Sequence, residues 1–400
     1  MKSIVSIRKT EGNGYDEIKT AVDAVIKDIG GLEDVIRPGY HVIIKPNMVT
    51  VPTSRLSGAV TRWEVSLAVY EAVKSCGGIP VIAESASVGS DTEAVIKFCG
   101  YDKLIDKGIP VIDLKGKWKN GKPADAGMPC SIIVPEAKVT HKILTWELVR
   151  DADAIITIPV MKTHDQAEIT LGMKNLKGLM RDSGKKLFHR YGLVESIVDL
   201  NTVLKPCLEI VDGTFGQEGL GPVLGDTKEM DLIIGSKDVV ACESVTGLIM
   251  GYDPEEVPVT KAAAARGLGN MNIDEIEVKG EKVNNVKCRF IRSHETKIEG
   301  VSDSFKMVFD EGACTGCRNT VVSALMDMKN AGLLKYTEDL IIAAGPVSDE
   351  NIEGLDHSQI VCVGACAKQL AEKYNLRYAE GCSPRNPVVV KTILNGREEY

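Results

Sequence analysis

Residues 154–162 read AIITIPVMK, a run of apolar and β-branched side chains that ends in a lysine. Such a run is typical of a strand buried on both faces of a parallel sheet. Similar runs are HVIIKPN at 41–47, IPVIAES at 79–85, LEIVDG at 208–213 and DLIIGS at 231–236. Stretches with helical apolar spacing lie between the runs, at 61–76, 91–107, 190–204 and 238–250. This alternation predicts an α/β fold with a mostly parallel sheet and helices on both faces.

The chain has 400 residues, more than one compact core usually holds, so we expect two domains. A more polar stretch at 270–303, in which IEVKG and VKCRFI resemble a short antiparallel ribbon, closes the first domain. The rest of the chain repeats the alternation on a smaller scale, with strand-like runs KMVFDEG, DLIIAAG, QIVCVGAC and LRYAEGC and helical segments at 319–333, 349–355 and 366–375. We therefore predict a large α/β domain at 1–303 and a smaller α/β domain at 304–400.

The net charge of −8 argues against a general nucleic-acid-binding protein, which would carry a basic surplus. The amino-terminal apolar run is broken by charge within seven residues, so we expect neither a signal peptide nor a membrane span. A cytoplasmic location follows from this interpretation. In that compartment the eleven cysteines would stay reduced and would not form a disulfide framework.

Five of these cysteines fall in the small domain, whereas the other six are scattered and are interpreted as small buried apolar residues. The five are Cys314, Cys317, Cys362, Cys366 and Cys382. Each lies at or just beyond the end of a predicted strand, and the carboxyl ends of parallel strands share one edge of a sheet. We therefore expect their thiolates to converge on one metal centre.

Four thiolates with no histidine nearby suit either a [4Fe–4S] cluster or a tetrahedral zinc ion. The iron–sulfur cluster is favoured, because structural zinc usually holds small knuckles that cannot fold alone, whereas this domain has its own sheet. One of the five cysteines is surplus to a four-ligand site, and the sequence leaves open which one. Metal-free thiols are the remaining alternative.

A cationic segment, IPVMKTHDQAEITLGMKNLKGLMRDSGKKLFHRYG at 158–192, stands out on this acidic chain. Lys162 and His164 directly follow a buried strand, and Lys45 has the equivalent place in IIKPN. A charge placed there must reach water or a ligand, so a small carboxylate or phosphate is the expected ligand. Lys174 and Lys177 either bind this ligand or line the polar side of a helix. Lys185, Lys186 and Arg190 are interpreted as solvated surface.

The runs IIKPN, DADAIITIPVMKTH, GMKNLKG, the later HR, IVDG and GP-x-x-G together resemble the DUF362 family. This uncharacterised family often carries an iron–sulfur module at its end, so the resemblance implies such a cofactor here. Many members end in C-x2-C-x2-C-x3-C-P, and this chain departs from that pattern because its cysteines are spread over a separate α/β module.

A remoter likeness is to lactate racemase, in which a lysine that tethers a nickel-pincer cofactor lies between two histidines. His164, Lys174 and His189 occur here in the same order. The likeness implies that Lys174 anchors a cofactor or substrate and that His164 is an acid/base group. His189 would then be a metal ligand or a second base, in a racemase or epimerase.

Two functions follow from these features. The first is an iron–sulfur enzyme, an oxidoreductase or an isomerase, that binds a small anionic substrate through Lys45, Lys162 and Lys177. His164 would move a proton, and the cluster would supply electrons or act as a Lewis acid. The candidate catalytic residues are Lys45, Asn47, Lys162, His164, Lys174, Asn175, Lys177 and His189. The second is a non-catalytic electron carrier or partner-binding protein that requires a redox partner, with a zinc-stapled tail as the structural alternative.

Overall fold

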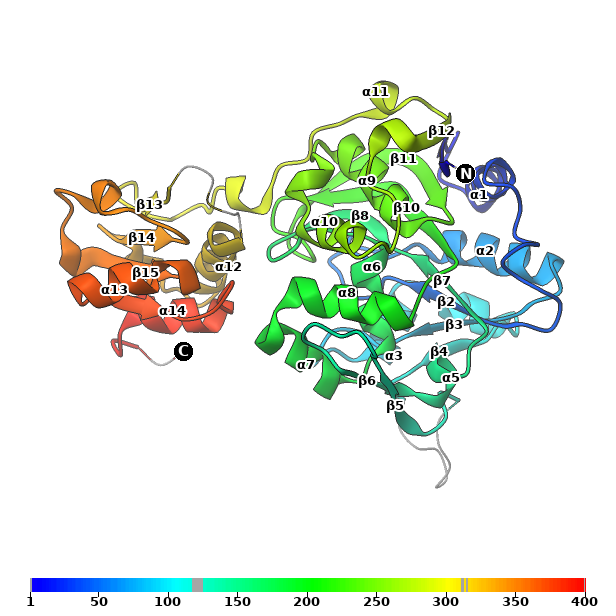
Figure 1. Ribbon diagram of the computed structural model, residues 1–400, viewed down its shortest axis with the longest axis horizontal. Coiled ribbons are helices and arrows are strands. Elements are labelled where there is room, and N and C mark those ends of the chain that lie inside the picture. Colours follow the sequence, from blue (N-terminus) through cyan, green and yellow to red (C-terminus); the bar gives the residue numbers. More distant parts are fainter. Residues whose placement is uncertain (1, 117–124, 311–312, 314–315, 399) are drawn as a thin grey trace. The chain divides into compact units, whose positions relative to one another are not determined.

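The computed structural model describes residues 2–116, 125–310, 313, 316–398 and 400, with only the backbone at 189 and 190. Its internal contacts divide the chain into two compact units. Unit 1 comprises Met1–Lys162, Ile169–Glu218 and Pro222–Phe290. Unit 2 comprises Thr163–Glu168, Gly219–Gly221 and Ile291–Tyr400. Figure 1 shows the elements of both units along the chain.

Unit 1 is built on a large sheet whose main path is β12-β1-β11-β10-β7-β2-β3-β4, and β8 and β9 lie off this path. Within the path only β11 runs against its neighbours, so the predicted mostly parallel sheet is confirmed. The strands are β1 Ser3–Lys9, β2 His41–Pro46, β3 Ile79–Glu84, β4 Val111–Asp113, β7 Ala154–Ile158, β8 Val160–His164, β9 Glu168–Thr170, β10 Leu208–Glu218, β11 Asp226–Ser236 and β12 Ile276–Gly280. A separate hairpin joins β5 Pro129–Ile133 to β6 Lys142–Trp146.

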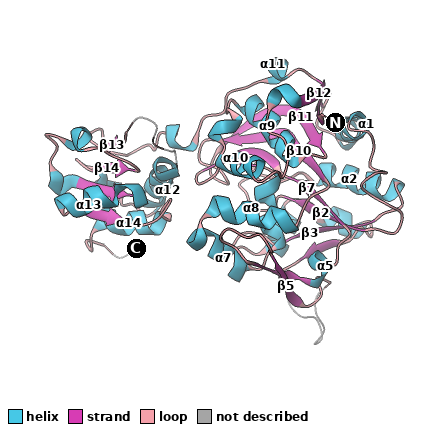
Figure 2. Cartoon of the chain, in the orientation of Figure 1, coloured by secondary structure: helices cyan, strands magenta, loops and turns pink. Residues whose placement is uncertain are grey.

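Helices cover this sheet, as Figure 2 shows by secondary structure. They are α1 Tyr15–Asp28, α2 Trp63–Ser75, α3 Thr92–Phe98, α4 Asp102–Asp106, α5 Glu147–Arg150, α6 Gly172–Asn175, α7 Asp182–Tyr191, α8 Leu193–Val203, α9 Val239–Met250, α10 Pro258–Ala265 and α11 Val283–Val286. One apolar core joins α1 to α4 with the sheet, and another joins α9 with it. In β11, Ile233 belongs to the first core, and Leu232 and Ile234 belong to the second, as strand alternation requires.

Proline 159 divides the sequence run 154–162 into two strands. Its ring provides no backbone N–H for a sheet ladder, so β7 ends at Ile158 and β8 begins at Val160. After this break β8 pairs with β10 rather than continuing along β2. The lysine that ends the run therefore lies on a different strand from the isoleucines that begin it.

Unit 2 contains a four-stranded parallel sheet in the order β13-β14-β15-β16. Its strands are β13 Lys306–Val308, β14 Ile341–Ala344, β15 Ile360–Val363 and β16 Arg377–Ala379, and its helices are α12 Gly316–Asn330, α13 Lys368–Tyr374 and α14 Asn386–Leu394. Each strand lies within one of the four predicted runs. One apolar core packs α12 and α14 on the sheet, and a second core includes residues of α13.

The predicted antiparallel ribbon at 270–303 is wrong. The IEVKG run forms β12, which pairs in parallel with β1. The VKCRFI run forms no strand, because Cys288 and Phe290 donate backbone hydrogen bonds to the end of α9. The longest segment of unit 2 is Ile291–Tyr400, in which Ile298 packs in the core that contains α12. In the described part of the chain, no helix is long and apolar enough to cross a membrane.

We expect the central strand β7 to dominate the stability of unit 1. Ile156 is fully buried there in the core of α1 to α4. Replacing it with alanine should lower the free energy of unfolding by about 2–5 kcal/mol, through lost burial and the cavity left behind. Ile105→Ala is the matched control, because Ile105 is 48% exposed and should change the value by about 0.5 kcal/mol. Urea unfolding measures both, and equal effects would contradict this account of the core.

Candidate functional site

Polar side chains gather at the carboxyl edge of the large sheet, around the ends of β2, β3 and β7. Lys45 lies at the end of β2 and Glu84 at the end of β3, and β7 lies on the other side of β2. The chain leaves β2 toward β3 and leaves β7 toward β10, in opposite directions across the sheet. Ligands of open α/β sheets bind where the connections diverge in this way. This edge is therefore the candidate site.

Lys45 is buried and forms an ion pair with Glu84. Its Nζ donates to Glu84 Oε2 at 2.7 Å, to the Pro46 carbonyl oxygen at 2.6 Å and to Asn175 Oδ1 at 2.9 Å. An ammonium group has three donors, so this set is complete. Gly178 lies directly above the pair, because a Cβ atom there would come within 2.0 Å of Glu84 Oε1 and 2.6 Å of Lys45 Nζ.

Two asparagines connect Lys45 to a second buried lysine. Asn175 Oδ1 accepts from Lys45 and from Asn47 Nδ2, and Asn175 Nδ2 donates to the Lys45 carbonyl and to Thr157 Oγ1. Asn47 Oδ1 in turn accepts from Lys162 Nζ at 3.0 Å. The result is a continuous buried path from Lys45 through Asn175 and Asn47 to Lys162.

Lys162 is fully buried and has no acidic partner in the described part of the chain. Its Nζ donates to Asn47 Oδ1, to the Ala59 carbonyl at 2.6 Å and to the Pro222 carbonyl at 3.0 Å. All three acceptors are neutral oxygens. Burial, followed by the nearby charge of Lys45, lowers the pKa of Lys162 to about 7.

Lys185 was predicted to be solvated surface, and that prediction is wrong. It is 5% exposed, and its Nζ donates to the carbonyl and hydroxyl oxygens of Ser85 and to the Ala86 carbonyl, each at 2.7 Å. The burial lowers its pKa to about 8. Lys186, two positions before Phe188, is exposed as predicted.

Lys177 is half-buried, with its Nζ 5.6 Å from the centre of the Phe188 ring. Burial, and then the charge of Lys185, lowers the pKa of Lys177 to about 8. Lys174 lies in α6 and is also half-buried. The predicted site residue His189 lies on α7, and its side chain is outside the described residues.

The structure therefore brings together Lys45, Asn47, Lys162 and Asn175 among the predicted residues. Sequence reasoning missed Glu84, which has the same kind of position as Lys45 because it ends the apolar strand IPVIAE. The rule that singled out Lys45, a charge at the end of a buried strand, would have found it. As described, neither Lys45 nor Lys162 has an N–H left for an anion, since each makes three hydrogen bonds.

His164 belongs to unit 2, in the short segment Thr163–Glu168. Its Nδ1 accepts from the backbone N–H of Gln166 at 2.9 Å, which places the proton of the neutral ring on Nε2. Nδ1 also lies 3.0 Å from Asp165 Oδ1, so a protonated ring would form an ion pair there. This arrangement allows a proton to be given or taken at Nε2.

Helix α12 holds the segment that contains His164. Ser323 Oγ donates to Asp165 Oδ2 at 3.1 Å, and Asn319 Nδ2 donates to Glu168 Oε1 at 3.0 Å. These two helix residues are four positions apart, so they lie on the same side of α12. The first turn of the same helix carries Cys317.

The turns after β15 and β16 lie close to the sulfur of Cys317. A Cβ atom on Gly364 would come within 2.3 Å of Cys317 Sγ, and Gly364 has φ of +101°, so only glycine fits there. The backbone N–H of Ala365 donates to the Gly381 carbonyl at 2.8 Å. Cys366 and Cys382 follow these two residues directly, and both are exposed. These three cysteines lie along the carboxyl edge of the small sheet.

Cys362 belongs to a different core of unit 2 from Cys317. It is fully buried within β15, in the core that contains residues of α13, whereas Cys317 belongs to the core of α12 and α14. Burial raises the pKa of the Cys362 thiol to about 11. Cys314 lies outside the described residues. Within those residues, no three His, Cys, Asp or Glu side chains are grouped closely enough to hold a metal ion.

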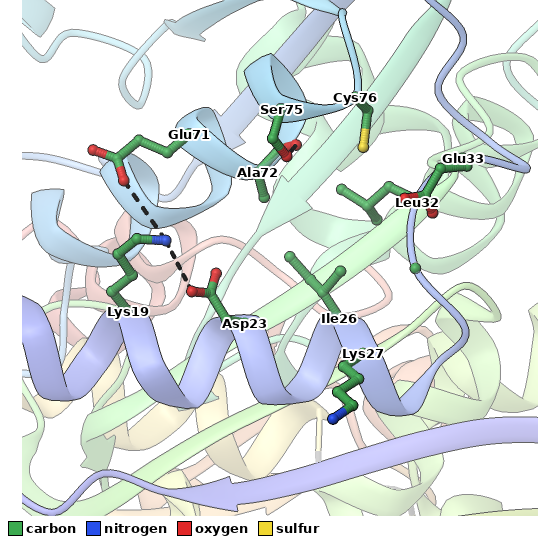
Figure 3. Close-up of a pocket in the computed structure, with 11 residues that line it drawn as sticks. Lys19, Asp23, Ile26, Lys27, Leu32, Glu33, Glu71, Ala72, Ser75 and Cys76 are labelled. Atoms are coloured by element: carbon green, nitrogen blue, oxygen red, sulfur yellow. Dashed lines mark hydrogen bonds and ion pairs between the residues drawn. The ribbon is translucent and has the colours of Figure 1, made fainter.

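A pocket of about 360 Å³ lies between α1 and α2 (Figure 3). It opens at the amino ends of β2 and β3, next to Glu33 and Cys76. Lys19 in its wall pairs with Asp23 at 2.8 Å and with Glu71 at 3.7 Å, as the dashed lines show. The pocket contains none of the predicted site residues.

The comparison with protein families matches residues 42–246 to the family described as Domain of unknown function (DUF362). That range contains all four residues of the buried lysine network. The chain belongs to the DUF362 family. A relative in this comparison is the Thylakoid-associated protein sll1697 of Synechocystis sp. (strain ATCC 27184 / PCC 6803 / Kazusa). It is 30% identical over 277 residues, which are 67% of this DUF362 chain and 81% of the relative.

Among solved structures, the lactate racemase apoprotein from Thermoanaerobacterium thermosaccharolyticum matches with a TM-score of 0.37 and 10% identity. The match covers 61% of this DUF362 protein and 57% of the racemase chain, less than two thirds of that protein. A similarity of this size carries no functional argument. The racemase hypothesis, with its roles for Lys174 and His189, stays a prediction.

The close contact above the Lys45–Glu84 pair gives a direct test of the site. Gly178→Ala would place a methyl group against the buried carboxylate and ammonium, so it should lower the free energy of unfolding by about 1–3 kcal/mol. Gly247→Ala is the control: it lies in α9, and its nearest neighbour would be 3.7 Å from the new Cβ atom. Chemical denaturation of both variants measures the difference. If the Gly178→Ala protein were as stable as the control, residue 178 could move away from the Lys45–Glu84 pair without lowering the free energy of unfolding.

Proposed function

We propose that this DUF362 protein is an enzyme that binds a small carboxylate or phosphate substrate at the carboxyl edge of its large sheet. Lys162 is the anion-binding residue, and His164 is the acid/base group. An iron–sulfur cluster in unit 2 is the proposed cofactor. The reaction would be an oxidoreduction or an isomerisation.

Lys162 is the observation that carries the proposal. Burying an ammonium group without an opposite charge is expensive, so buried lysines are normally paired. Lys45 follows this rule through Glu84, but Lys162 contacts only neutral oxygens. Lys185 adds a third buried ammonium to the same edge. An anion that replaced one neutral acceptor of Lys162 would supply the missing charge.

The Pro222 carbonyl is the acceptor that an anion would replace at the lowest cost. It comes from the connection after β10, where Pro222 itself is half-buried, whereas Asn47 and Ala59 are buried. Asn47 is also held by Asn175, so its displacement would break a second hydrogen bond. Loss of the Pro222 contact leaves the rest of the network intact.

His164 and Lys162 are two residues apart on β8, so their side chains leave the strand on the same face. The Nδ1 bond from Gln166 fixes the tautomer of His164, and Asp165 would stabilise the protonated ring. A carbon acid or an alcohol of an anionic substrate is a suitable proton source for such a base.

Among the cysteines predicted for the cluster, Cys317, Cys366 and Cys382 lie along the carboxyl edge of the small sheet, where, as described, they are not grouped closely enough to hold a metal ion. The cluster, when bound, would supply or accept electrons. Helix α12 carries Cys317 and also fixes the segment of His164 through Asn319 and Ser323. The proposed acid/base group and the proposed cluster thus share one rigid element within unit 2.

Binding of small anions tests the role of Lys162. Inorganic phosphate, or a carboxylate from a series of small mono- and dicarboxylates, should raise the melting temperature of the wild-type protein above the level seen with equal chloride. Lys162→Met should weaken this binding at least about tenfold, or about 1.4 kcal/mol. Lys186→Met is the control, because it removes one exposed positive charge and should leave binding unchanged.

The pH dependence gives a second measurement of the same proposal. The anion requires the ammonium form of Lys162, whose pKa lies at about 7. Carboxylate affinity should therefore fall as pH rises through this value, by about tenfold per pH unit well above it. Equal anion binding by wild type and Lys162→Met at pH 6 would show that Lys162 has only a structural role, through its hydrogen bonds to Asn47, Ala59 and Pro222.

The cofactor is tested by metal analysis of protein purified without oxygen. We expect a brown protein with about four irons per chain, as a [4Fe–4S] cluster requires. Iron, acid-labile sulfide and the visible absorption spectrum measure this directly. A colourless protein with stoichiometric zinc would instead favour the zinc-stapled tail.

A further inference from the structure

We infer that Glu209 and Glu243 are a proton-sharing carboxyl pair that positions α6, and through α6 the Asn175 side chain of the buried lysine network. Glu209 lies on β10 and Glu243 on α9, and both side chains are buried. The sharing of a proton does not depend on the proposed function. Its effect on anion binding rests on the proposed function, because that effect requires the anion site at Lys162.

The two carboxyl groups bind consecutive backbone N–H groups in the first turn of α6. Glu209 Oε1 accepts from the N–H of Gly172 at 2.8 Å, and Glu243 Oε1 accepts from the N–H of Met173, also at 2.8 Å. Gly172 fits closely against the first carboxyl, since a Cβ atom there would lie 2.6 Å from Glu209 Oε1. These N–H groups have no acceptor within the helix, so the start of α6 depends on the two glutamates.

Neither carboxyl forms an ion pair among the residues that the structure describes, and the charge acting most strongly on Glu209 is that of Glu243. The second oxygen of Glu243 accepts from the neutral Thr260 hydroxyl at 3.0 Å. Glu209 Oε2 is buried without a hydrogen-bond partner. Two desolvated negative charges on neighbouring N–H groups are unfavourable, and a proton on one carboxyl removes most of that cost.

The elements packed around the pair bring one acid, one thiol and two lysines into its surroundings. They are Asp238 at the start of α9, Cys242 within α9, Lys174 on α6 and Lys261 on α10. The acid and the thiol adjoin Glu209, whose neighbours across the sheet, Thr157 and Ser236, are neutral. Of the lysines, the one on α6 is half-buried and the one on α10 is exposed.

These surroundings increase the affinity of the pair for a proton. Burial, and then the negative charge of Glu243, raises the pKa of Glu209 well above its ordinary value. Burial raises the pKa of Glu243 to about 7. At neutral pH Glu209 is therefore the protonated member of the pair, and Glu243 is the member that ionises as the pH rises.

Helix α6 connects this pair to the lysine network. The helix spans only Gly172–Asn175, so the residue that Glu209 binds is three positions from Asn175. Asn175 Oδ1 accepts from Lys45 Nζ and from Asn47 Nδ2, and Asn47 Oδ1 accepts from Lys162. A shift of the first turn of α6 would therefore move the oxygen on which Lys45 and Asn47 both depend.

Infrared spectroscopy tests whether Glu209 carries a proton. A protonated carboxyl group has a C=O band that a carboxylate lacks. The wild-type spectrum at pH 7 should lose part of this band in Glu209→Gln and keep it in the control Glu93→Gln, whose side chain is 65% exposed. An unchanged band in Glu209→Gln would show that Glu209 is ionised and would overturn the inference.

The pH dependence of unfolding tests the same proton by a second route. Because the folded-state pKa is raised, the stability that the proton confers is complete below the ordinary glutamate pKa of 4.5 and is lost as the pH rises toward 7. The unfolding constant of the wild type, relative to that of Glu209→Gln, should therefore rise over this range by up to about tenfold per pH unit. The same pH dependence in both proteins would contradict proton sharing.

Anion binding at pH 6, measured by calorimetry with inorganic phosphate, tests the positioning of α6. The amide oxygen of Glu209→Gln can still accept from Gly172, so this variant should bind like the wild type. Glu209→Ala has no such acceptor and should bind about fivefold more weakly, as the loss of one hydrogen bond implies. The same comparison at Glu243, with glutamine and alanine, provides a second pair of variants.

The outcomes separate this inference from the proposed function. If the wild type binds neither phosphate nor carboxylates, the proposed function is wrong, and the infrared and unfolding measurements still decide whether the pair shares a proton. If the alanine variants bind phosphate as tightly as the glutamine variants, the pair does not position α6, whereas the anion site at Lys162 stands.

Discussion

The need to satisfy two buried ammonium groups shapes the carboxyl edge of the large sheet. Lys45 takes its acceptors from Pro46, Glu84 and Asn175, which lie on β2, β3 and α6. A buried donor without a partner costs about 1–3 kcal/mol, and more when it is charged. Each of these segments is therefore held in place by the same nitrogen atom, and Gly178 allows them to close over it.

The sequence predicted the sheet and half of this site for a simple reason. Apolar runs such as AIITIPV have few ways to be buried, so their pattern determines strand and helix order. A lysine at the end of such a run, as at Lys45 and Lys162, must lie at the edge where the strand stops. Glu84, which ends β3, obeys the same rule.

Other features depend on contacts that no local pattern contains. Lys185 lies in a run of charged residues that resembles a solvated helix face. The side chain is nevertheless buried, and its Nζ donates to the carbonyl oxygens of Ser85 and Ala86. Those acceptors are about a hundred residues away in the sequence. Cys362 illustrates the opposite case, because the strand pattern Val-Cys-Val already implied that its side chain leaves the face of its neighbours. The spacing between Cys362 and Cys366 suggested a ligand pair, whereas strand alternation turns the Cys362 side chain into the core that contains residues of α13.

The contacts of α12 extend to the short segment of the chain that carries His164. Glu168 is buried, and Asn319 of α12 donates to its carboxylate. A protein that ended at 303 would leave that carboxylate, and Asp165 beside His164, without their partners on the helix. The segment of His164 therefore requires the helix that carries Cys317, and the cysteine-rich part of the chain is a structural component of the proposed acid/base group whether or not it binds a metal.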